Sequence, residues 1–292
     1  MLAVEYPLIR ASLHVVPDSD CRLRSIPKRP HALDQLKARV PFTKERVGDR
    51  TWYRQFDSLR TKPPHTRAYH KMREIAQSCG IESPSMSVHL CEAPGGFVVA
   101  TAEFGSPRWT WIALSSPKGL QPFDTSLLPS ERGHFVACDV RCYDECIAHV
   151  PCGVACLVTA DGATGEHDGL EEDHVDLLVA QTRLAIHCLR RGGTYVAKFF
   201  EGRCRTTTGA WIAWITTVFG NVGIIKPTWS RPTNSERYIV ARDFQRGAQN
   251  VEFPPLHTIV VADKWYEDLE RIVDTMLDEQ ARHLNAALAR HA

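Results

Sequence analysis

The amino-acid sequence predicts an α/β fold with a mostly parallel central sheet flanked by helices, an N-terminal helical extension and a C-terminal helix. Three observations predict it. Short apolar runs that suit buried strands alternate with longer segments of helical periodicity. One such run leads into Ala93-Pro94-Gly95-Gly96 and then a fresh apolar run, which indicates a strand turning sharply into a helix. The segment from Asp263 to His291 carries an apolar stripe at helical spacing.

Length and charge limit the classes of protein. The 292 residues favour one large α/β domain with extensions over two independent domains. The 35 Lys and Arg residues nearly cancel the 34 Asp and Glu residues, so only a local basic face could attract nucleic acid. The ten cysteines form no paired CxxC framework, and we find no secretory signal or long apolar span. We therefore expect a soluble, intracellular protein with reduced thiols and no membrane contact.

We divide the chain into a partly helical N-terminal extension (1–65), a central domain (66–250) and a helical tail (251–292) packed on that domain. In the extension, residues 21–30 are basic. This run is consistent with a nuclear localisation signal, with a phosphate-binding arm or with a solvent-exposed tail, and we favour the tail. Helical periodicity begins near Ala32 and returns around Trp52 to Leu59. Thr66 is the expected N-cap of a helix that ends near Gly80.

In the central domain, apolar runs predict the strands and longer periodic segments predict the helices between them. The expected helices are Leu170–Arg191, closed by Gly192-Gly193 as a C-cap, and Ala210–Phe219. The expected strands are Val88–Leu90, Trp109–Leu114, Phe135–Asp139, Cys156–Gly162, Thr194–Phe200 and, as candidates for the last two, Val222–Ile225 and Arg237–Ala241.

Isolated charges mark the predicted strand ends. Asp161 closes one apolar strand and Lys198 interrupts another. Either could be a structural charge, but strand carboxyl ends in this architecture border the ligand crevice. Both would then face the glycine turn, where a nucleotide-like ligand settles. Lys71 on a helix and Glu236 before a strand complete a set of two lysines and two carboxylates.

Five segments together resemble the FtsJ-like RNA ribose 2′-O-methyltransferases, and within them the eukaryotic and viral mRNA cap methyltransferases. The resemblance runs from about Arg67 to Val240. His89-Leu90-Cys91-Glu92-Ala93-Pro94-Gly95 is similar to the branch that modifies the second transcribed nucleotide. The five segments are Arg67–Met72, Cys91–Phe97, Val158–Gly162, Ala197–Phe200 and Lys226–Tyr238.

This resemblance implies a Rossmann-like class I methyltransferase that uses S-adenosylmethionine to methylate a ribose 2′-hydroxyl on the first or second nucleotide of capped RNA. The family's Lys-Asp-Lys-Glu tetrad falls on Lys71, Asp161, Lys198 and Glu236. Lys198 would be the base, its neutral form favoured by burial and by nearby positive charge. The resemblance implies that Asp139 accepts from the adenine amine and that Leu114 or Ser115 lies near the cofactor ribose. The full set of implied cofactor contacts is Glu92, Ala93, Pro94, Gly95, Gly96, Phe97, Leu114, Ser115, Asp139 and Asp161.

The resemblance also implies RNA as partner: the capped mRNA 5′ end, together with other capping-apparatus proteins, and a nuclear location. Tyr69, His70 and Trp229 could stack on a cap base, or belong to the core. Two other functions stay open: methylation of internal ribosomal or transfer RNA positions, and an inactive RNA-binding scaffold, which the intact tetrad disfavours. The candidate RNA-binding residues are Arg67, Arg203, Arg205 and Arg231, with Arg60 and Lys62 beside them.

Two positions depart from the family pattern, and one alternative site is tested. His89 stands where many relatives have Asp, so Glu92 is the candidate to supply that charge. Thr66 stands where an Asn is common. Cys138, Cys142 and Cys146 suggest zinc, but Cys138 and Cys156 fall in predicted strands, where cysteine behaves as a small hydrophobe. We expect no metal.

Overall fold

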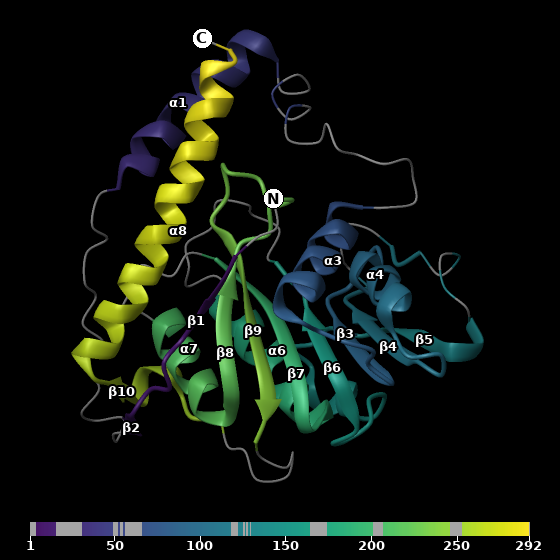
Figure 1. The fold of residues 1–292 in the computed structure, drawn as a ribbon. Coiled ribbons are helices and arrows are strands. Elements are labelled where there is room, and N and C mark those ends of the chain that lie inside the picture. Colours follow the sequence, from purple (N-terminus) through teal and green to yellow (C-terminus); the bar gives the residue numbers. More distant parts are fainter. Residues whose placement is uncertain are drawn as a thin grey trace.

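The structure is a computed structural model that describes residues 4–15, 31–48, 52, 55, 66–117, 122–124, 126, 128, 130–163, 174–200, 207–245 and 253–291. Within these residues, one sheet of eight strands forms the centre of the molecule (Figure 1). Its spatial order is β1 (Glu5–Pro7), β8 (Phe219–Ile225), β9 (Glu236–Phe244), β7 (Leu189–Phe200), β6 (Ala155–Ala160), β3 (Met86–Leu90), β4 (Thr110–Ser115) and β5 (Gly133–Ala137). A separate pair joins β2 (Leu13–Val15) to β10 (Ile259–Val261).

The strands from β7 to β5 are parallel, and β9 enters antiparallel between β7 and β8. Helices cover both faces. Side chains of α3 (Arg67–Cys79) and α4 (Gly96–Phe104) pack with Leu157 and Val196, whereas α6 (Val175–Cys188) and α7 (Thr207–Val218) pack with Val158 and Tyr195, which point to the opposite face. A short helix, α5 (Tyr143–Ile147), follows β5. The predicted α/β fold with a mostly parallel sheet is confirmed.

The predicted end of the helix before β7 is wrong. We expected the helix to run to Arg191 with Gly192-Gly193 as its cap, but α6 ends at Cys188 and the chain is already extended at Leu189. Leu189 pairs with Ala155, and the next pair joins Thr194 to Leu157, so the residues between form a bulge. Gly192 has φ +77°, a conformation that glycine adopts without strain. Gly192 and Gly193 therefore lie in a bulged part of β7 and do not cap a helix.

Other boundaries differ by a few residues. The structure begins α7 at Thr207 and ends β5 at Ala137, and β9 extends to Phe244. The three short strands β1, β2 and β10 have no counterpart in the prediction. The segments 170–173 and 21–30 and most of 49–65 lie outside the described residues, although Trp52 is fully buried.

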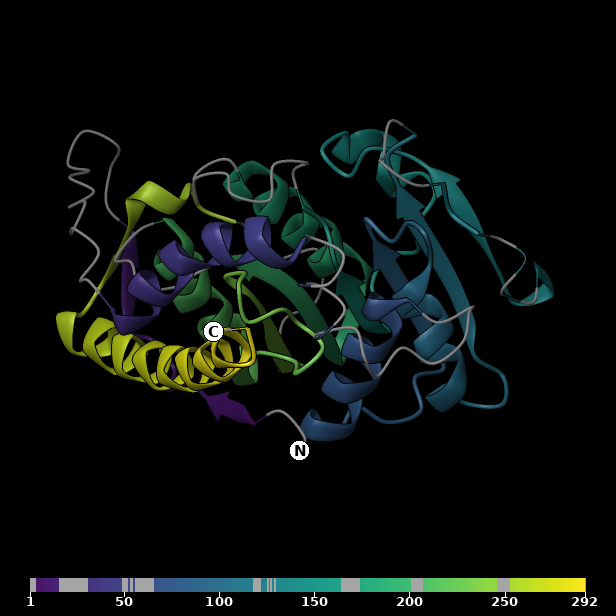
Figure 2. The same cartoon turned by 90° about the horizontal axis from the view of Figure 1, so that it is seen from above.

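Two helices outside the sheet stand side by side, α1 (Ala32–Val47) and α8 (Asp263–Ala289), and rise beyond one edge of the molecule (Figures 1 and 2). Leu33 and Val40 of α1 share one apolar cluster with Leu277 and Leu284 of α8. Confirming the prediction, the C-terminal segment is one long amphipathic helix. Among the helices described, none has the length and apolar character needed to span a membrane.

A buried polar chain crosses the sheet at His89. Its Nδ1 lies 2.8 Å from Thr159 Oγ1 on β6, and its Nε2 lies 2.7 Å from Ser87 Oγ. Trp109 Nε1 donates to the same Ser87 hydroxyl at 2.9 Å. Burial lowers the pKa of His89 to about 3. His89 is therefore a neutral cross-strand link inside the sheet.

This burial predicts a specific pH dependence of stability. An unfolded histidine titrates near pH ~6.5, so the contribution of His89 is complete above that pH and is lost as the pH falls toward its folded pKa of about 3. At pH ~5 the loss is about 2 kcal/mol, at about 1.4 kcal/mol per pKa unit. Urea unfolding at neutral pH and at pH ~5 measures it. His89→Gln is expected to lose about 2 kcal/mol less than wild type on acidification.

The control is His134→Gln, because His134 is exposed on β5. This variant should keep the wild-type change between the two pH values. Equal acid sensitivity in wild type and His89→Gln would show that His89 is not the group that titrates.

Candidate active site

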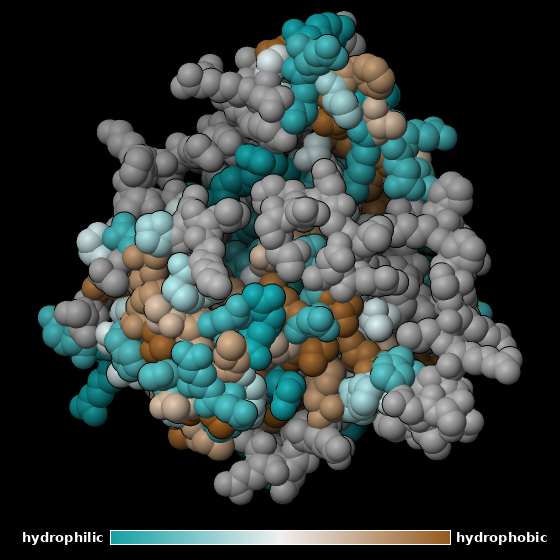
Figure 3. All heavy atoms as spheres, turned by 180° about the vertical axis from the view of Figure 1, so that it is seen from behind, coloured by the Kyte–Doolittle hydropathy of each residue, from teal (hydrophilic) through white to brown (hydrophobic). Residues whose placement is uncertain are grey.

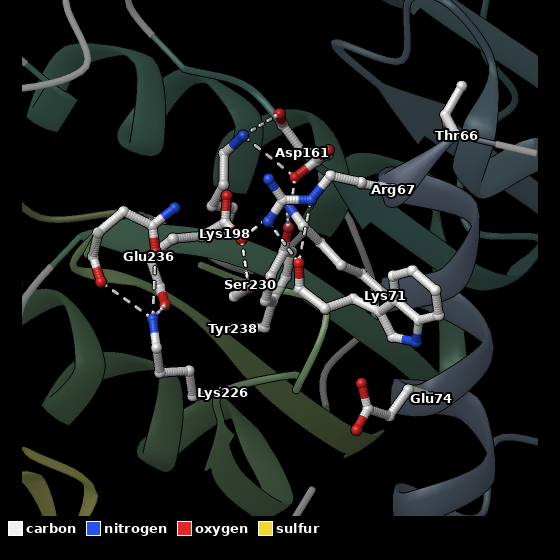
Figure 4. A network of polar contacts seen from close by, with 12 residues as sticks. Thr66, Arg67, Lys71, Glu74, Asp161, Lys198, Lys226, Ser230, Glu236 and Tyr238 are labelled. Carbon is white, nitrogen blue, oxygen red and sulfur yellow. Dashed lines mark hydrogen bonds and ion pairs between the residues drawn. The ribbon is translucent and has the colours of Figure 1, made fainter. Parts of the chain in front are cut away.

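The four predicted tetrad residues come together at the carboxyl edge of the parallel strands (Figure 4). Lys71 Nζ lies 2.7 Å from Glu236 Oε1, and Lys198 Nζ lies 3.1 Å from Asp161 Oδ1. Lys198 also donates to the backbone carbonyl of Asp161 at 2.6 Å. Both lysines and Glu236 are at least nine-tenths buried. The fold therefore brings together two close, largely desolvated lysine–carboxylate ion pairs.

Strand pairing explains this convergence. β6 and β7 are parallel with Ala160 opposite Ala197, so the next residues, Asp161 and Lys198, meet at the edge. In the antiparallel ladder of β7 and β9, Phe200 lies opposite Glu236. Lys71 arrives from α3, which packs on the same face of the sheet as α4.

Tyr238 links the two pairs, a role that the sequence analysis missed. Its hydroxyl donates to Asp161 Oδ1 at 2.7 Å, and Lys71 Nζ lies 3.5 Å from the same oxygen. The side chain is fully buried and lies opposite Lys198 in the ladder. The sequence could have indicated this role, because residues 236 and 238 of one strand point to the same face, so Tyr238 lies beside Glu236.

The electrostatics correct one expectation. Burial lowers the pKa of Lys198, as predicted, but the negative charges of Asp161 and Glu236 outweigh burial and leave the pKa above its ordinary value. For Glu236, burial raises the pKa, but Lys71 and Lys198 outweigh it and hold the pKa well below the usual range. In this structure Lys198 is an ammonium group, not the neutral amine that we expected.

The segment 226–235 holds Glu236 in place. Ser230 Oγ donates to Glu236 Oε1 at 2.5 Å, and Lys226 Nζ donates to the Glu236 carbonyl at 2.9 Å. Glu74 on α3 accepts hydrogen bonds from the Thr228 backbone N–H and hydroxyl, both at 2.8 Å. The carboxylate is therefore positioned from its own loop and from α3.

The glycine turn has two functions. Gly95 has φ +114°, which only glycine adopts without strain, and it directly precedes α4. Gly96 serves helix packing, because a Cβ there would lie 2.8 Å from the Ala68 Cβ and 2.8 Å from the Tyr69 nitrogen. Thr66 takes the N-cap position of α3, where it accepts from the Tyr69 N–H at 3.3 Å. Thr66 therefore caps the start of α3.

The side chain of Glu92 folds back onto the glycine turn. Its Oε1 accepts from the backbone N–H of Phe97 at 2.5 Å and of Val98 at 3.4 Å, at the start of α4. Burial, with the nearby charge of Asp161, raises the pKa of Glu92 well above its usual range. Its Oε2 is buried and has no hydrogen-bond partner among the described residues. The raised pKa favours the protonated carboxyl, so Glu92 does not supply the negative charge that we expected of it.

A cavity of about 430 Å³ lies beside the turn, at the ends of β4 and β5. Phe123 and Phe135 stack within it, with centroids 4.7 Å apart and planes at 11°. Flat apolar walls with a few hydroxyl groups suit a nucleoside, and the volume falls within the range of small-molecule sites. The cavity is lined by Ala93, Ser115, Ser116, Pro117, Pro122, Phe123 and Phe135. The two phenylalanines had no signal in the sequence beyond being apolar.

The predicted cofactor residues differ in whether they line this cavity. Ala93 and Ser115 line it. Leu114 is fully buried, and its carbonyl accepts from the Glu92 N–H at 3.1 Å. Asp139 is half-buried and forms an ion pair with Arg141 at 2.6 Å. Its carboxylate is already occupied by a cation two residues away.

Of the predicted RNA-binding residues, the structure describes two. Arg67 donates to the Trp229 carbonyl at 3.2 Å from Nε and 2.5 Å from Nη2, and Arg231 lies partly buried in the segment 226–235. His70 stacks on Trp229, with centroids 3.9 Å apart and planes at 11°. Tyr69 is buried and bonds to Glu103, so it belongs to the core. Arg60, Lys62, Arg203 and Arg205 lie outside the described residues.

The zinc alternative finds no support in the part of the chain that the structure describes. No group of three or more His, Cys, Asp and Glu side chains is arranged there to hold a metal ion. Cys138 and Cys146 are buried against each other, and Cys142 is exposed.

Residues 64–244, more than half of the chain, match the family model described as FtsJ-like methyltransferase. The chain belongs to the FtsJ-like methyltransferase family. This match spans the four tetrad residues, the glycine turn and the whole sheet except β1.

Three relatives show how the similarity is distributed. A Schizosaccharomyces pombe tRNA (cytidine(32)/guanosine(34)-2′-O)-methyltransferase is 28% identical over 201 residues, which cover 61% of this chain and 65% of the relative. A Dictyostelium discoideum protein named for the same tRNA reaction is 31% identical over 188 residues, covering 61% and 67%. The cap-specific mRNA (nucleoside-2′-O-)-methyltransferase of Autographa californica nuclear polyhedrosis virus is 37% identical over 95 residues, covering 31% and 36%. The chain thus spans about two thirds of the tRNA enzymes and about a third of the viral cap enzyme.

The Lys71–Glu236 pair predicts an asymmetric stability cost. Lys71→Met leaves a buried carboxylate without its nearest cation, which is expected to cost about 3 kcal/mol. Lys71→Met/Glu236→Gln removes the charge as well, so it should recover most of that loss. Denaturant unfolding of Lys71→Met, of Glu236→Gln and of the double variant measures this coupling.

The matched control is the pair Lys264–Asp268 on α8, at a similar distance of 2.7 Å, in which the lysine is exposed to solvent. Lys264→Met is expected to cost less than about 1 kcal/mol. Similar losses for Lys71→Met and Lys264→Met would contradict the desolvated pairing in the candidate site.

Proposed function

We propose that this protein transfers a methyl group from S-adenosylmethionine to a ribose 2′-hydroxyl of RNA. The observation that carries the proposal is the pair of buried lysine–carboxylate contacts at 2.7 and 3.1 Å, beside a cavity suited to a nucleoside. Ala93, Ser115 and Phe123 would hold the cofactor's nucleoside part. When bound, the cofactor supplies an activated methyl group on a sulfonium ion.

The residues of this chain would orient the hydroxyl and take its proton. Lys71 with Glu236, and Lys198 with Asp161, place donors and acceptors around one point, which aligns the attacking oxygen. The hydroxyl proton passes to Lys198 Nζ in its neutral form and then to solvent. Because Asp161 and Glu236 raise the pKa of Lys198, the neutral form is the minor one near pH ~7. Tyr238 supports this arrangement by holding Asp161.

The relatives favour an internal position of transfer RNA as the first candidate substrate. The two longer matches, each covering 61% of this chain, are to proteins named for tRNA 2′-O-methylation. A capped mRNA 5′ end is the second candidate. It is supported by the shorter viral match of 37% identity and by the Cys91-Glu92-Ala93-Pro94-Gly95-Gly96-Phe97 turn.

The substrate class can be decided by one comparison. Purified protein and labelled S-adenosylmethionine are incubated with unmodified tRNA, with a short capped RNA and with the same RNA uncapped. We expect label in tRNA, and none when the acceptor ribose is replaced by 2′-deoxyribose. Labelling of capped RNA alone would establish the second candidate, and no labelling of any RNA would overturn the proposed function.

The role of Lys198 predicts both a loss and a pH profile. Lys198→Ala and Lys198→Arg are each expected to lose about 10²–10⁴-fold in kcat, because neither side chain can accept the proton. Since the folded pKa lies above its ordinary value, wild-type kcat should rise about tenfold per pH unit from about pH 7 to 9. Calorimetric titration with S-adenosylhomocysteine is the control and should show retained binding in both variants. Near-normal turnover in Lys198→Arg would assign proton removal to another group.

A further inference from the structure

The exposed face of α1 carries an aromatic side chain between two arginines. Arg39, Phe42 and Arg46 are spaced three and four residues apart, so they form one stripe along the helix. All three are exposed, and Phe42, at 76%, is the most exposed large hydrophobic side chain among the described residues. The chain continues through this stripe as a regular helix, with Pro41 inside it.

Packing does not account for this stripe. The opposite face of α1 supplies Leu33 and Val40 to the apolar cluster shared with α8, and His31 Nε2 contacts Asp278 of α8 at 3.2 Å. Within the described residues, α1 therefore docks through the side that carries Leu33 and Val40. Seen from behind, the upper part of the molecule, where α1 and α8 stand, carries mainly hydrophilic side chains with a few hydrophobic ones between them (Figure 3).

The position of α1 places this helix near the candidate active site, with Lys37 on its inner side and the stripe on its outer side. Lys37 Nζ lies 3.4 Å from the Ser235 hydroxyl, directly before Glu236 in the chain. α1 and α8 both extend past the edge of the sheet where the segment 226–235 lies (Figures 1 and 2). α1 also lies outside residues 64–244, which match the family. An RNA strand that enters the tetrad can pass beside this helix.

The charges of the two helices differ in sign. α1 carries four cationic side chains against two acidic ones, whereas α8 carries seven acidic side chains against three cationic ones. The overall charge of the chain is only +1, so its attraction for RNA must come from local surfaces of this kind. A polyanion is attracted by α1 and repelled by α8.

We propose that the Arg39–Phe42–Arg46 face of α1 is an RNA-binding surface separate from the tetrad. The two guanidinium groups contact phosphates, and the Phe42 ring stacks on an unpaired base. This inference rests on the proposed function, since it concerns how the same substrate is held. It names residues that lie outside the family's matched region.

The test measures RNA affinity and its dependence on salt. Fluorescence anisotropy with the RNA that wild type methylates best is recorded over a series of KCl concentrations. Arg39→Gln/Arg46→Gln should reduce the slope of log affinity against log salt by about 1.5 to 2, the value for two lost phosphate contacts. Phe42→Ala should weaken binding about 5- to 100-fold with little change of slope. In both variants KM for RNA should rise while kcat at saturating RNA stays unchanged.

The matched control is Arg271→Gln/Arg282→Gln, which removes the same charge from exposed positions of the acidic α8. It should leave the salt slope unchanged. If wild type methylates RNA but the α1 variants bind with wild-type affinity and slope, the inference is overturned while the proposed function stands. It is equally overturned if Phe42→Ala changes only the self-association of the protein, seen by light scattering, because the face would then bind a second copy.

Discussion

Two lysine–carboxylate pairs, buried where the parallel strands end, set the requirements for the rest of this structure. A buried charge is tolerated only with a close partner, and here each partner comes from a different element. Lys71 arrives on α3, Asp161 follows β6, Lys198 lies in β7 and Glu236 begins β9. The pairs form only when all four elements are docked. The geometry of the site is therefore a property of the assembled sheet.

The extensions on either side of the family's matched region also support the site. Gln280 of α8 donates through Nε2 to the Pro232 carbonyl at 2.6 Å and to the Asn234 carbonyl at 2.8 Å. Lys37 of α1 reaches Ser235 in the same segment. All three contacts fall on residues just before Glu236, which Ser230 and Lys71 also hold. The inner sides of α1 and α8 thus stabilise the loop that presents the carboxylate.

The sequence predicted the parts of the fold that depend on local pattern. Apolar runs located the parallel strands, and the charges at their ends singled out Asp161 and Lys198, because parallel strands finish at one edge. The family resemblance added Lys71 and Glu236 to form the tetrad. Long-range pairing was not visible. No local signal shows that β9 enters antiparallel between β7 and β8, or that Gly192 belongs to a bulge rather than a helix cap. Phe123 reaches the cavity from a segment without regular structure, so only the folded chain could reveal it.

The protonation of Lys198 shows why burial alone is a poor guide to chemistry. Desolvation lowers the pKa of Lys226 well below its usual value, and Arg237 adds to this effect. Lys226 is half-buried, and its ammonium group donates to oxygens of Asn234 and Glu236. Those oxygens are neutral carbonyls and cannot compensate for lost hydration as Asp161 does for Lys198. The lysine with the lowered pKa therefore holds a loop, and the lysine with the raised pKa occupies the tetrad. A perturbed pKa identifies a functional group only when the charges that perturb it are named.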